Sequence, residues 1–424
     1  MAQVHPGPTS RAGKRFSDEQ VAFLFQAYAQ GLMSRVEVQQ ALAVGKARFF
    51  ALWKGYRSNP QAFSVSYQRA TRKRISPQAE AAVESEPLRE KALIEDDELP
   101  ISGYNYSAVR DRLHKQGVAI SVNTIIDRAK RLGCHRPRRK NRPHDREVLT
   151  ASVGALIQHD GSSHRWSPFA KEKWTLITSI DDYSRMILFA DFFPAETTWA
   201  HIRATQALIE TYGLPLRYYV DSLRVFRFVQ GRDSFWRKHV LQTDDVDTQW
   251  GKMVRLLGVK VVFALSPQAK GKVERPYRWL QDRIVRTCAI ERFTTLEDVR
   301  AVLREEVDRY NNHQVHSTTR EIPGRRFATA LAQTNSLFRP FSIPKPYTST
   351  KDVFCLRERR MLNAYRRISL FGQDIQVPHV PLREEVDIHM VPDAEADHME
   401  LRIWWNDHMV HSLTLPLERF SVQF

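Results

Sequence analysis

The chain contains few cysteines and no long run of apolar residues. Its three cysteines, Cys134, Cys288 and Cys355, lie far apart among 424 residues, which argues against a disulfide framework and fits a reducing compartment. Cys134, His135 and His144 could suggest a zinc site, but two Cys-Cys or His-His pairs at ligand spacing are missing, so a zinc site is not expected. No stretch reaches the roughly 18 apolar residues that a membrane span needs. The N-terminal segment lacks the apolar core of a signal peptide, and we therefore expect a cytoplasmic protein without a membrane partner.

Negative charge is in deficit. Lysine and arginine number 64 against 48 acidic residues, which gives a formal net charge of +16. A protein this basic is typically a partner of an anionic polymer, and nucleic acid is the leading candidate. A generally basic surface without a specific partner is the alternative.

The N-terminal region has a helical pattern. Residues 1–16 are small, polar and basic and are expected to be disordered, and residues 17–60 contain signals for three short helices. Ser17 and Ser34 each begin a capping box. The third helix, residues 44–57, is basic, and a basic helix after a tight turn is typical of a helix-turn-helix DNA-binding domain. An ordinary three-helix bundle is the alternative. The DNA-binding candidates on the third helix are Lys46, Arg48 and Lys54.

A second helical region covers residues 61–134 and ends in another helix pair at helix-turn-helix spacing, residues 106–117 and 122–133. Its second helix offers Asn123, Thr124 and Arg128 as DNA contacts. Residues 135–149 then form a basic linker arm rich in proline and arginine, suited to following phosphates or a minor groove. The candidates on the arm are Arg136, Arg138, Arg139 and Lys140.

From about residue 150 the pattern changes to alternating strands and helices. Strand signals at 153–160, 173–193, 216–221 and 259–265, with helices between and after them, predict a mixed α/β domain over residues 150–330. Residues 340–424 contain short apolar runs separated by turn residues, which predicts a small all-β barrel or sandwich. The fold class is therefore multidomain α/β, with helical domains in front and a β domain behind.

Three carboxylates stand at informative positions in the α/β region. Asp160 is expected to end the first strand, Asp221 the fourth, and Glu274 lies on the helix after the fifth. If these side chains converge, their oxygens favour Mg²⁺, with Mn²⁺ able to substitute, over zinc. A pair of such ions activates a water or a 3′-hydroxyl at a phosphodiester, so no side-chain nucleophile is needed.

The sequences IQHDGS, SIDDYSR, YYVDSLRVF and SPQAKGKVERPYRWLQ make this region resemble the DDE transposase and retroviral integrase superfamily. The helical modules in front and the β domain behind are similar to those of bacterial insertion-sequence transposases, including the not yet classified and Mu-related groups. The resemblance implies an RNase H-like catalytic core with Asp160, Asp221 and Glu274 as its metal-binding catalytic triad. It also implies double-stranded DNA as the partner, namely the terminal inverted repeats and the target DNA. It further implies a homodimer or larger oligomer, in which the DNA-binding domain of one subunit serves the active site of another. The sequence does not indicate a helper ATPase, and the resemblance implies action on DNA in the bacterial nucleoid.

The chain departs from the family pattern after the second aspartate. Ser222 and Leu223 follow Asp221, and the interval from Asp221 to Glu274 is long, 274 − 221 = 53 residues. We interpret residues 222–257 as an insertion that contacts DNA or a neighbouring subunit.

The segment from 266 to 284 is expected to place Glu274 at the metal site. Gly271 permits a close backbone approach. Lys270, Lys272 and Arg275 are placed to hold phosphates beside the bond to be cut. Tyr277 and Trp279 are expected to pack rather than to stack on a base.

Other acids and histidines have plainer interpretations. Asp181 and Asp182 occupy a tight turn, which favours a structural role over metal binding. The acidic cluster at 244–247 is interpreted as a solvated loop, and His159 as a packing or capping residue. His164 also flanks Asp160.

Two other functions are compatible with parts of this pattern. A sequence-specific DNA-binding regulator derived from an inactive transposase would use the same helical modules, but it has no reason to keep all three acids. A structure-selective nuclease of the same fold would not need two helix-turn-helix modules.

Overall fold

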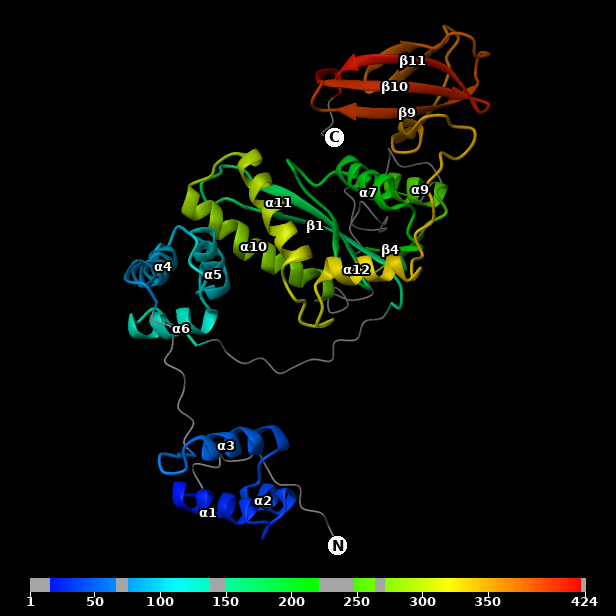
Figure 1. Ribbon diagram of the computed structural model, residues 1–424. Helices are drawn as coiled ribbons and strands as arrows, with labels where there is room; N and C mark the ends of the chain where they lie inside the picture. The colour runs from blue at the N-terminus through cyan, green and yellow to red at the C-terminus, as the bar shows by residue number, and fades with distance from the viewer. Residues whose placement is uncertain (1–15, 66–74, 138–149, 221–247, 264–270, 421–424) are drawn as a thin grey trace. The chain divides into compact units, whose positions relative to one another are not determined.

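The computed structural model describes residues 16–65, 75–137, 150–220, 248–263 and 271–420; at 271–275 it describes the backbone alone. Contacts divide the chain into two compact units, Met1–Glu80 and Ala81–Phe424. Figure 1 shows the elements of each unit.

The N-terminal unit contains the three predicted helices. They are α1 (Asp18–Ala29), α2 (Arg35–Leu42) and α3 (Lys46–Ser58). The capping boxes of Ser17 with Gln20 and of Ser34 with Glu37 are both formed, so these two local predictions are confirmed. Phe25 and Phe49 lie at the centre of an apolar core between the helices.

Three further helices follow, and the first of them begins in the last residues of the smaller unit. They are α4 (Pro77–Glu95), α5 (Tyr106–Lys115) and α6 (Val122–Arg131). Ser121 caps α6 through the backbone N–H of Thr124. Val83, Val109, Leu113 and Ile125 form the small core that joins the three helices. The predicted helix pair is present, and its assignment as a helix-turn-helix stays a prediction.

The central sheet has five strands. They are β1 (Ile157–His164), β2 (Trp174–Asp181), β3 (Ile187–Phe193), β4 (Arg217–Val220) and β5 (Lys260–Phe263). Their order is β3-β2-β1-β4-β5. The β1–β2 and β2–β3 pairs are antiparallel, whereas β1–β4 and β4–β5 are parallel. The predicted mixed α/β class is therefore confirmed in this coarse form.

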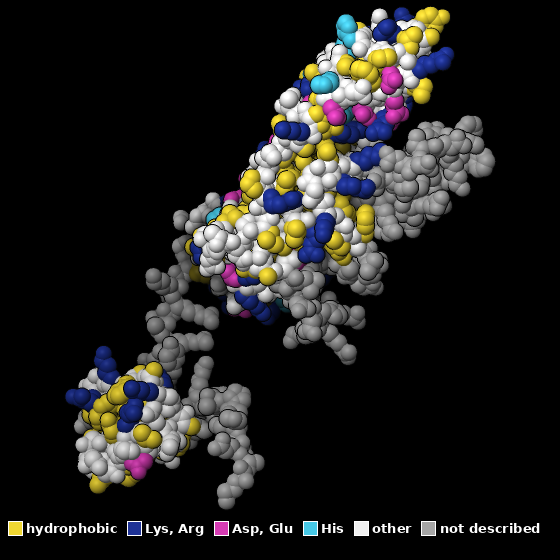
Figure 2. All heavy atoms as spheres, turned by 90° about the vertical axis from the view of Figure 1, so that its right-hand side faces the viewer, with side chains coloured by type: hydrophobic (Ala, Val, Ile, Leu, Met, Phe, Trp, Pro, Cys, Tyr) yellow, Lys and Arg dark blue, Asp and Glu magenta, His cyan; other side chains and the backbone are white. Residues whose placement is uncertain are grey.

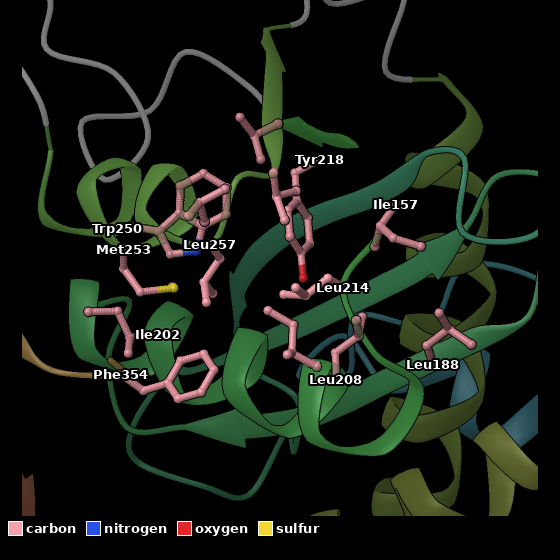
Figure 3. Close-up of a cluster of buried hydrophobic side chains, with 14 of the residues drawn as sticks. Ile157, Leu188, Ile202, Leu208, Leu214, Tyr218, Trp250, Met253, Leu257 and Phe354 are labelled. Atoms are coloured by element: carbon pink, nitrogen blue, oxygen red, sulfur yellow. The ribbon is translucent and has the colours of Figure 1, made fainter. Parts of the chain in front are cut away.

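Helices pack on both faces of this sheet. They are α7 (Thr198–Tyr212), α9 (Gln249–Leu256), α10 (Gly271–Glu291), α11 (Leu296–Asn312) and α12 (Pro323–Ala332). One core contains Leu208 of α7, Tyr218 of β4 and Trp250 of α9, as Figure 3 shows. A second core contains Leu280 and Ile284 of α10 with Val302 of α11. The apolar side of each helix therefore covers one side of the sheet.

The end of the first strand differs from the prediction. Asp160 was expected to end it, but β1 continues to His164 and pairs with β2 along its whole length. The sequence DGSS has weak strand propensity. Pairing with β2, which is buried throughout, keeps these residues in the strand. Gly161 lies within the strand, and a Cβ at this position would meet the Glu196 carboxylate at 2.6 Å.

The range expected as an insertion contains a helix of the core. Residues 221–247 lie outside the described part of the chain. In α9, however, Trp250, Met253 and Val254 are fully buried against the sheet. The C-terminal end of residues 222–257 therefore belongs to the folded α/β core.

The C-terminal region is built from strands. They are β6 (Leu356–Met361), β7 (Arg367–Leu370), β8 (Gln373–Gln376), β9 (Glu385–Asp393), β10 (His398–Trp405) and β11 (His408–Pro416), with one-turn 3₁₀ helices at Thr350–Asp352 and Leu417–Arg419. They form a four-stranded sheet, β11-β10-β9-β6, and a two-stranded sheet, β7-β8. The predicted β region is present, and its closure into a barrel stays a prediction. Across the described ranges, no helix combines the length and apolar character that spanning a membrane requires.

Candidate active site

Asp160 occupies the middle of β1, the central strand of the sheet. It is 6% exposed and pairs across the β1–β2 ladder with Thr178. Side chains alternate along a strand. Because His159 packs against Trp250 on the α7–α9 face, Asp160 belongs to the opposite face, on which α10 lies.

The neighbouring strand β4 runs parallel to β1 and leads directly to Asp221. Ile157 pairs with Tyr218, and Gln158 pairs with Tyr219. Asp160 is two residues beyond Gln158, and Asp221 is two residues beyond Tyr219. Asp221 itself lies outside the described residues; β4 is described to Val220, the residue before it.

The helix α10 is tied to β1 at Asp160. The buried hydroxyl of Tyr277 donates a hydrogen bond to the backbone carbonyl of Asp160 at 2.5 Å and accepts one from Thr178 at 2.9 Å. Burial, together with the nearby charge of Asp160, raises the pKa of Tyr277 well above its usual value, so the phenol stays protonated. The interpretation of Tyr277 as a packing residue is confirmed, and its hydrogen bond to Asp160 was not foreseen.

Glu274 precedes Tyr277 by one helical turn. Residues three apart on a helix share a face, and the backbone of α10 is helical from Gly271 onward. The side chains of Glu274, Lys272 and Arg275 lie outside the described part of the chain, as does Lys270.

The predicted DNA contacts are spread over several elements. Lys46 and Lys54 are exposed on α3, and Arg48 is half-buried there. Asn123 is exposed on α6, Thr124 and Arg128 are half-buried on it, and Arg136 is exposed after it. Arg138, Arg139 and Lys140 lie outside the described residues.

The acids of the β2–β3 turn are structural. Asp181 accepts hydrogen bonds from the backbone N–H of Gly154 at 2.9 Å and from the backbone N–H of Ser184 at 2.7 Å. Asp182 pairs with the guanidinium of Arg185 at 2.8 Å and accepts a hydrogen bond from Thr150 at 3.0 Å. These contacts hold the turn and agree with the structural interpretation. The acids at 244–247 lie outside the described residues.

A buried chain of polar groups lies under β1 on the α7 face. The His159 ring contacts the Ser179 hydroxyl at 2.8 Å and the His201 ring at 2.9 Å. His201 contacts the Glu196 carboxylate at 3.3 Å. Burial lowers the pKa of His159 well below its usual value, which keeps this ring neutral and confirms its packing role. His164, at the end of β1, contacts Gln281 of α10 at 2.8 Å.

A buried ion-pair network joins α4 and α5 to α10 and α11. Glu90 pairs with Arg112 at 2.7 Å and with Arg286 at 2.5 Å. Asp111 pairs with Arg283 at 2.8 Å and with Arg309 at 2.7 Å. We call these six residues the α10 clamp. Burial opposes the ionisation of Asp111, but the hydrogen bond from Arg110 and the charge of Arg283 lower its pKa below the usual value. No sequence signal marks the clamp, because its partners are far apart along the chain.

The donor chemistry of the predicted trio fits a hard divalent cation. Among the described residues, no group of three His, Cys, Asp or Glu side chains is placed to hold a metal ion. Asp160 is the member of the trio whose side chain is described, and its carboxylate supplies the oxygen ligand that Mg²⁺ favours.

The chain is similar to proteins named as transposases. An alignment of 298 residues at 26% identity relates it to y4bF of Sinorhizobium fredii (strain NBRC 101917 / NGR234), provisionally named a transposase, and covers 69% of this chain and 59% of that protein. A second alignment, of 159 residues at 32% identity, relates it to the transposase for insertion sequence IS1202 of Streptococcus pneumoniae and covers 38% of this chain and 32% of that protein. The predicted resemblance to transposases is confirmed. The chain thus spans 59% and 32% of the lengths of these two relatives. No family model matches it.

Solved structures of integrases show a weaker likeness. The HTLV-2 integrase catalytic core domain in complex with magnesium matches at 15% identity and a TM-score of 0.31, over 41% of this chain and 96% of that one. The simian T-cell lymphotropic virus intasome in complex with PP2A regulatory subunit B56 gamma matches at 13% identity and a TM-score of 0.33, over 72% of this chain and 92% of that one. TM-scores this low do not establish a common fold.

Proposed function

We propose that this chain is a DDE transposase, a polynucleotidyl transferase that cuts the ends of a mobile element and joins them to target DNA. The observation that carries the proposal is the placement of Asp160 between the parallel strand that leads to Asp221 and the helix that contains Glu274. The similarity to transposases over 69% of the chain supports it.

The proposed catalytic triad is Asp160, Asp221 and Glu274. The register of β1 and β4, continued by two residues, would place Asp160 beside Asp221. The hydrogen bond from Tyr277 to the Asp160 carbonyl supports the third member, because Glu274 precedes Tyr277 by one helical turn and would share the face of α10 that meets β1. We further propose that residues 150–330 form an RNase H-like core.

These three carboxylates would hold Mg²⁺, with Mn²⁺ able to substitute and two ions per site. Such ions activate a water or hydroxyl oxygen and stabilise the leaving oxygen of a phosphodiester. The triad would supply the carboxylate ligands, and Lys270, Lys272 and Arg275 would hold phosphates beside the reacting bond. In the joining step the 3′-hydroxyl oxygen of the cut end bonds to a target phosphorus, while the bond from that phosphorus to the target's 3′ oxygen breaks.

The helical regions would supply DNA recognition. We propose helix-turn-helix domains at 17–60 and 61–134, which bind the terminal inverted repeats of the element with α3 and α6. The linker arm at 135–149 would follow the DNA backbone, and residues 340–424 would form a C-terminal β-barrel. Because two ends must be joined together, we expect a homodimer or larger oligomer acting on nucleoid DNA in the bacterial cytoplasm.

The test is an assay with labelled element-end duplexes and a target plasmid in Mg²⁺. A transposase yields a joined product in the wild type, and Glu274→Gln abolishes that product while duplex binding persists. Cleavage without joining would instead identify a nuclease of the same fold. Binding without any cleavage, in Mg²⁺ and in Mn²⁺ with paired ends supplied, would identify the alternative function, a sequence-specific DNA-binding regulator derived from an inactive transposase.

A further inference from the structure

The helix α3 exposes an apolar stripe between positive charges. Phe50 is 46% exposed, although aromatic side chains on a helix usually face a core. Ala47 and Ala51 lie beside it and are exposed as well. Lys46 and Lys54, four residues before and after Phe50, are exposed on the same face, since residues four apart lie above one another on a helix.

The opposite side of α3 is fully used by the core of the N-terminal unit. Phe49 and Leu52 are buried against α1 and α2. The Trp53 ring lies 5.6 Å from that of Phe25 and 5.0 Å from that of Tyr28. Packing therefore fixes the rotation of α3, so that Phe50 faces outward as a consequence of the fold.

Charge on this unit favours an anionic partner for α3. The helix contains two lysines and two arginines and no acidic residue, whereas α1 and α2 contain the acids Asp18, Glu19 and Glu37. Figure 2 shows Lys and Arg side chains gathered with hydrophobic ones on one part of the N-terminal unit. A purely hydrophobic partner surface would not account for the positive charge on α3. The major groove of DNA accounts for both features, since it combines phosphates at its edges with thymine methyl groups on its floor.

We propose that α3 lies in the major groove of the bound DNA and that Phe50, with Ala47 and Ala51, determines sequence specificity by contacting thymine methyl groups. Lys46 and Lys54 contact the flanking phosphates and contribute affinity without specificity. The small side chains on both sides of Phe50 allow the helix backbone to come close to the base edges. The inference rests on the proposed function, because it names what the first helical module reads.

The experiment uses the full chain. A preferred duplex is selected from a randomised pool, and each thymine in it is then replaced by uracil, which removes only the 5-methyl group. Binding of each duplex is measured for the wild type and for Phe50→Ala. Burial of one methyl group is worth about fourfold in affinity, so we expect a loss of about that size at one or two thymines in the wild type and none in Phe50→Ala.

Two matched variants separate specificity from general binding. Phe23, on α1, is 69% exposed and lies outside the stripe, so Phe23→Ala is expected to retain the thymine preference. Lys54→Ala is expected to weaken binding to the thymine and the uracil duplexes equally. It should also reduce the slope of log affinity against log salt concentration by about one. Circular dichroism and the unfolding transition of each variant establish that the N-terminal unit is folded.

Several outcomes would overturn the proposal. A selected duplex without thymine in the α3 footprint, or equal thymine preference in the wild type and Phe50→Ala, rules out the methyl contact. A change in sedimentation of Phe50→Ala with unchanged DNA binding would show instead that the stripe joins two copies of the chain. A wild type that joins DNA ends without this preference refutes the inference alone, whereas a wild type that binds with the preference and never cuts refutes the proposed transposase.

Discussion

The α10 clamp is expected to hold the helices α4–α6 on the α/β core, and Glu90 is its most informative member. Glu90 is 0% exposed and receives the guanidinium groups of Arg112 and Arg286. In Glu90→Ala, Arg286 keeps the Gly103 carbonyl at 2.9 Å and Asp282 at 2.8 Å as partners. Asp282, however, is partly exposed and contributes less.

Removal of one partner of a buried ion pair leaves a charge in an apolar setting and typically costs about 3–5 kcal/mol. Arg112 retains Glu86 at 2.7 Å, so we expect a loss at the lower end of that range. Chemical unfolding of the full chain, followed by tryptophan fluorescence, measures the loss. Limited proteolysis, with cleavage sites identified by mass spectrometry, shows whether α4–α6 opens first.

Glu305→Ala is the matched control. Glu305 pairs with Lys115 of α5, but both side chains are exposed, and a surface pair is worth about 0–1 kcal/mol. A Glu90→Ala variant as stable as Glu305→Ala, with α4–α6 equally resistant to proteolysis, would show that the clamp does not hold these helices on the α/β core.

Three further predictions concern other parts of the chain. Tyr277→Phe removes the hydrogen bond to the Asp160 carbonyl. Since a net hydrogen bond contributes about 1 kcal/mol, we expect a small loss of stability, together with slower DNA cleavage at unchanged DNA affinity. An unchanged cleavage rate would contradict the positioning role of Tyr277. Burial opposes the charge of Asp352, but hydrogen bonds from His389 and Arg402 lower its pKa to about 2. The ionised carboxylate therefore contributes stability above its unfolded pKa, and this contribution is lost as the pH falls from about 4 to 2. The acid unfolding of Asp352→Asn should lack this pH-dependent loss, and identical pH profiles of the variant and the wild type would argue against the contribution. Gly213 has a φ of +95°, and a Cβ at this position would meet the Arg339 carbonyl oxygen at 2.5 Å. Gly213→Ala is therefore expected to lower the free energy of unfolding by more than about 1 kcal/mol. An unchanged unfolding midpoint would show that the backbone can relax.

Features set by neighbouring residues were predictable from the sequence. The helices α1 and α2 begin at the predicted serines because a capping box needs only four consecutive residues. The turn between β2 and β3 was predictable because Asp181 bonds to Ser184, three residues on.

Features that depend on residues far away in the sequence could not be predicted from it. The continuation of β1 past Gly161 depends on β2, and the burial of α9 depends on Tyr218 of β4, whose ring lies 5.5 Å from that of Trp250. The short helix α12 has no predicted counterpart, since Phe327 and Ala330 acquire their buried positions from the core around α7. The α10 clamp joins Glu90 to Arg286, residues 196 positions apart, and no local pattern distinguishes them from surface charges.

The candidate site divides in the same way. The sequence predicted Asp160 and Asp221 at the ends of two strands. Asp160 instead lies inside β1, and β1 runs parallel to β4, the strand that leads to Asp221. The bond between Tyr277 and the Asp160 carbonyl could not be predicted, because it depends on how α10 docks on the sheet.

The most direct test of the proposed triad measures the joining of a labelled element end to target DNA in Mg²⁺. The wild type is compared with Asp160→Asn, Asp221→Asn and Glu274→Gln, and with Asp308→Asn, which removes an exposed acid on α11. We expect joined product from the wild type and the control, and none from any of the three variants although each still binds the end. Joining by any one of these three variants at the wild-type rate would contradict the proposed triad.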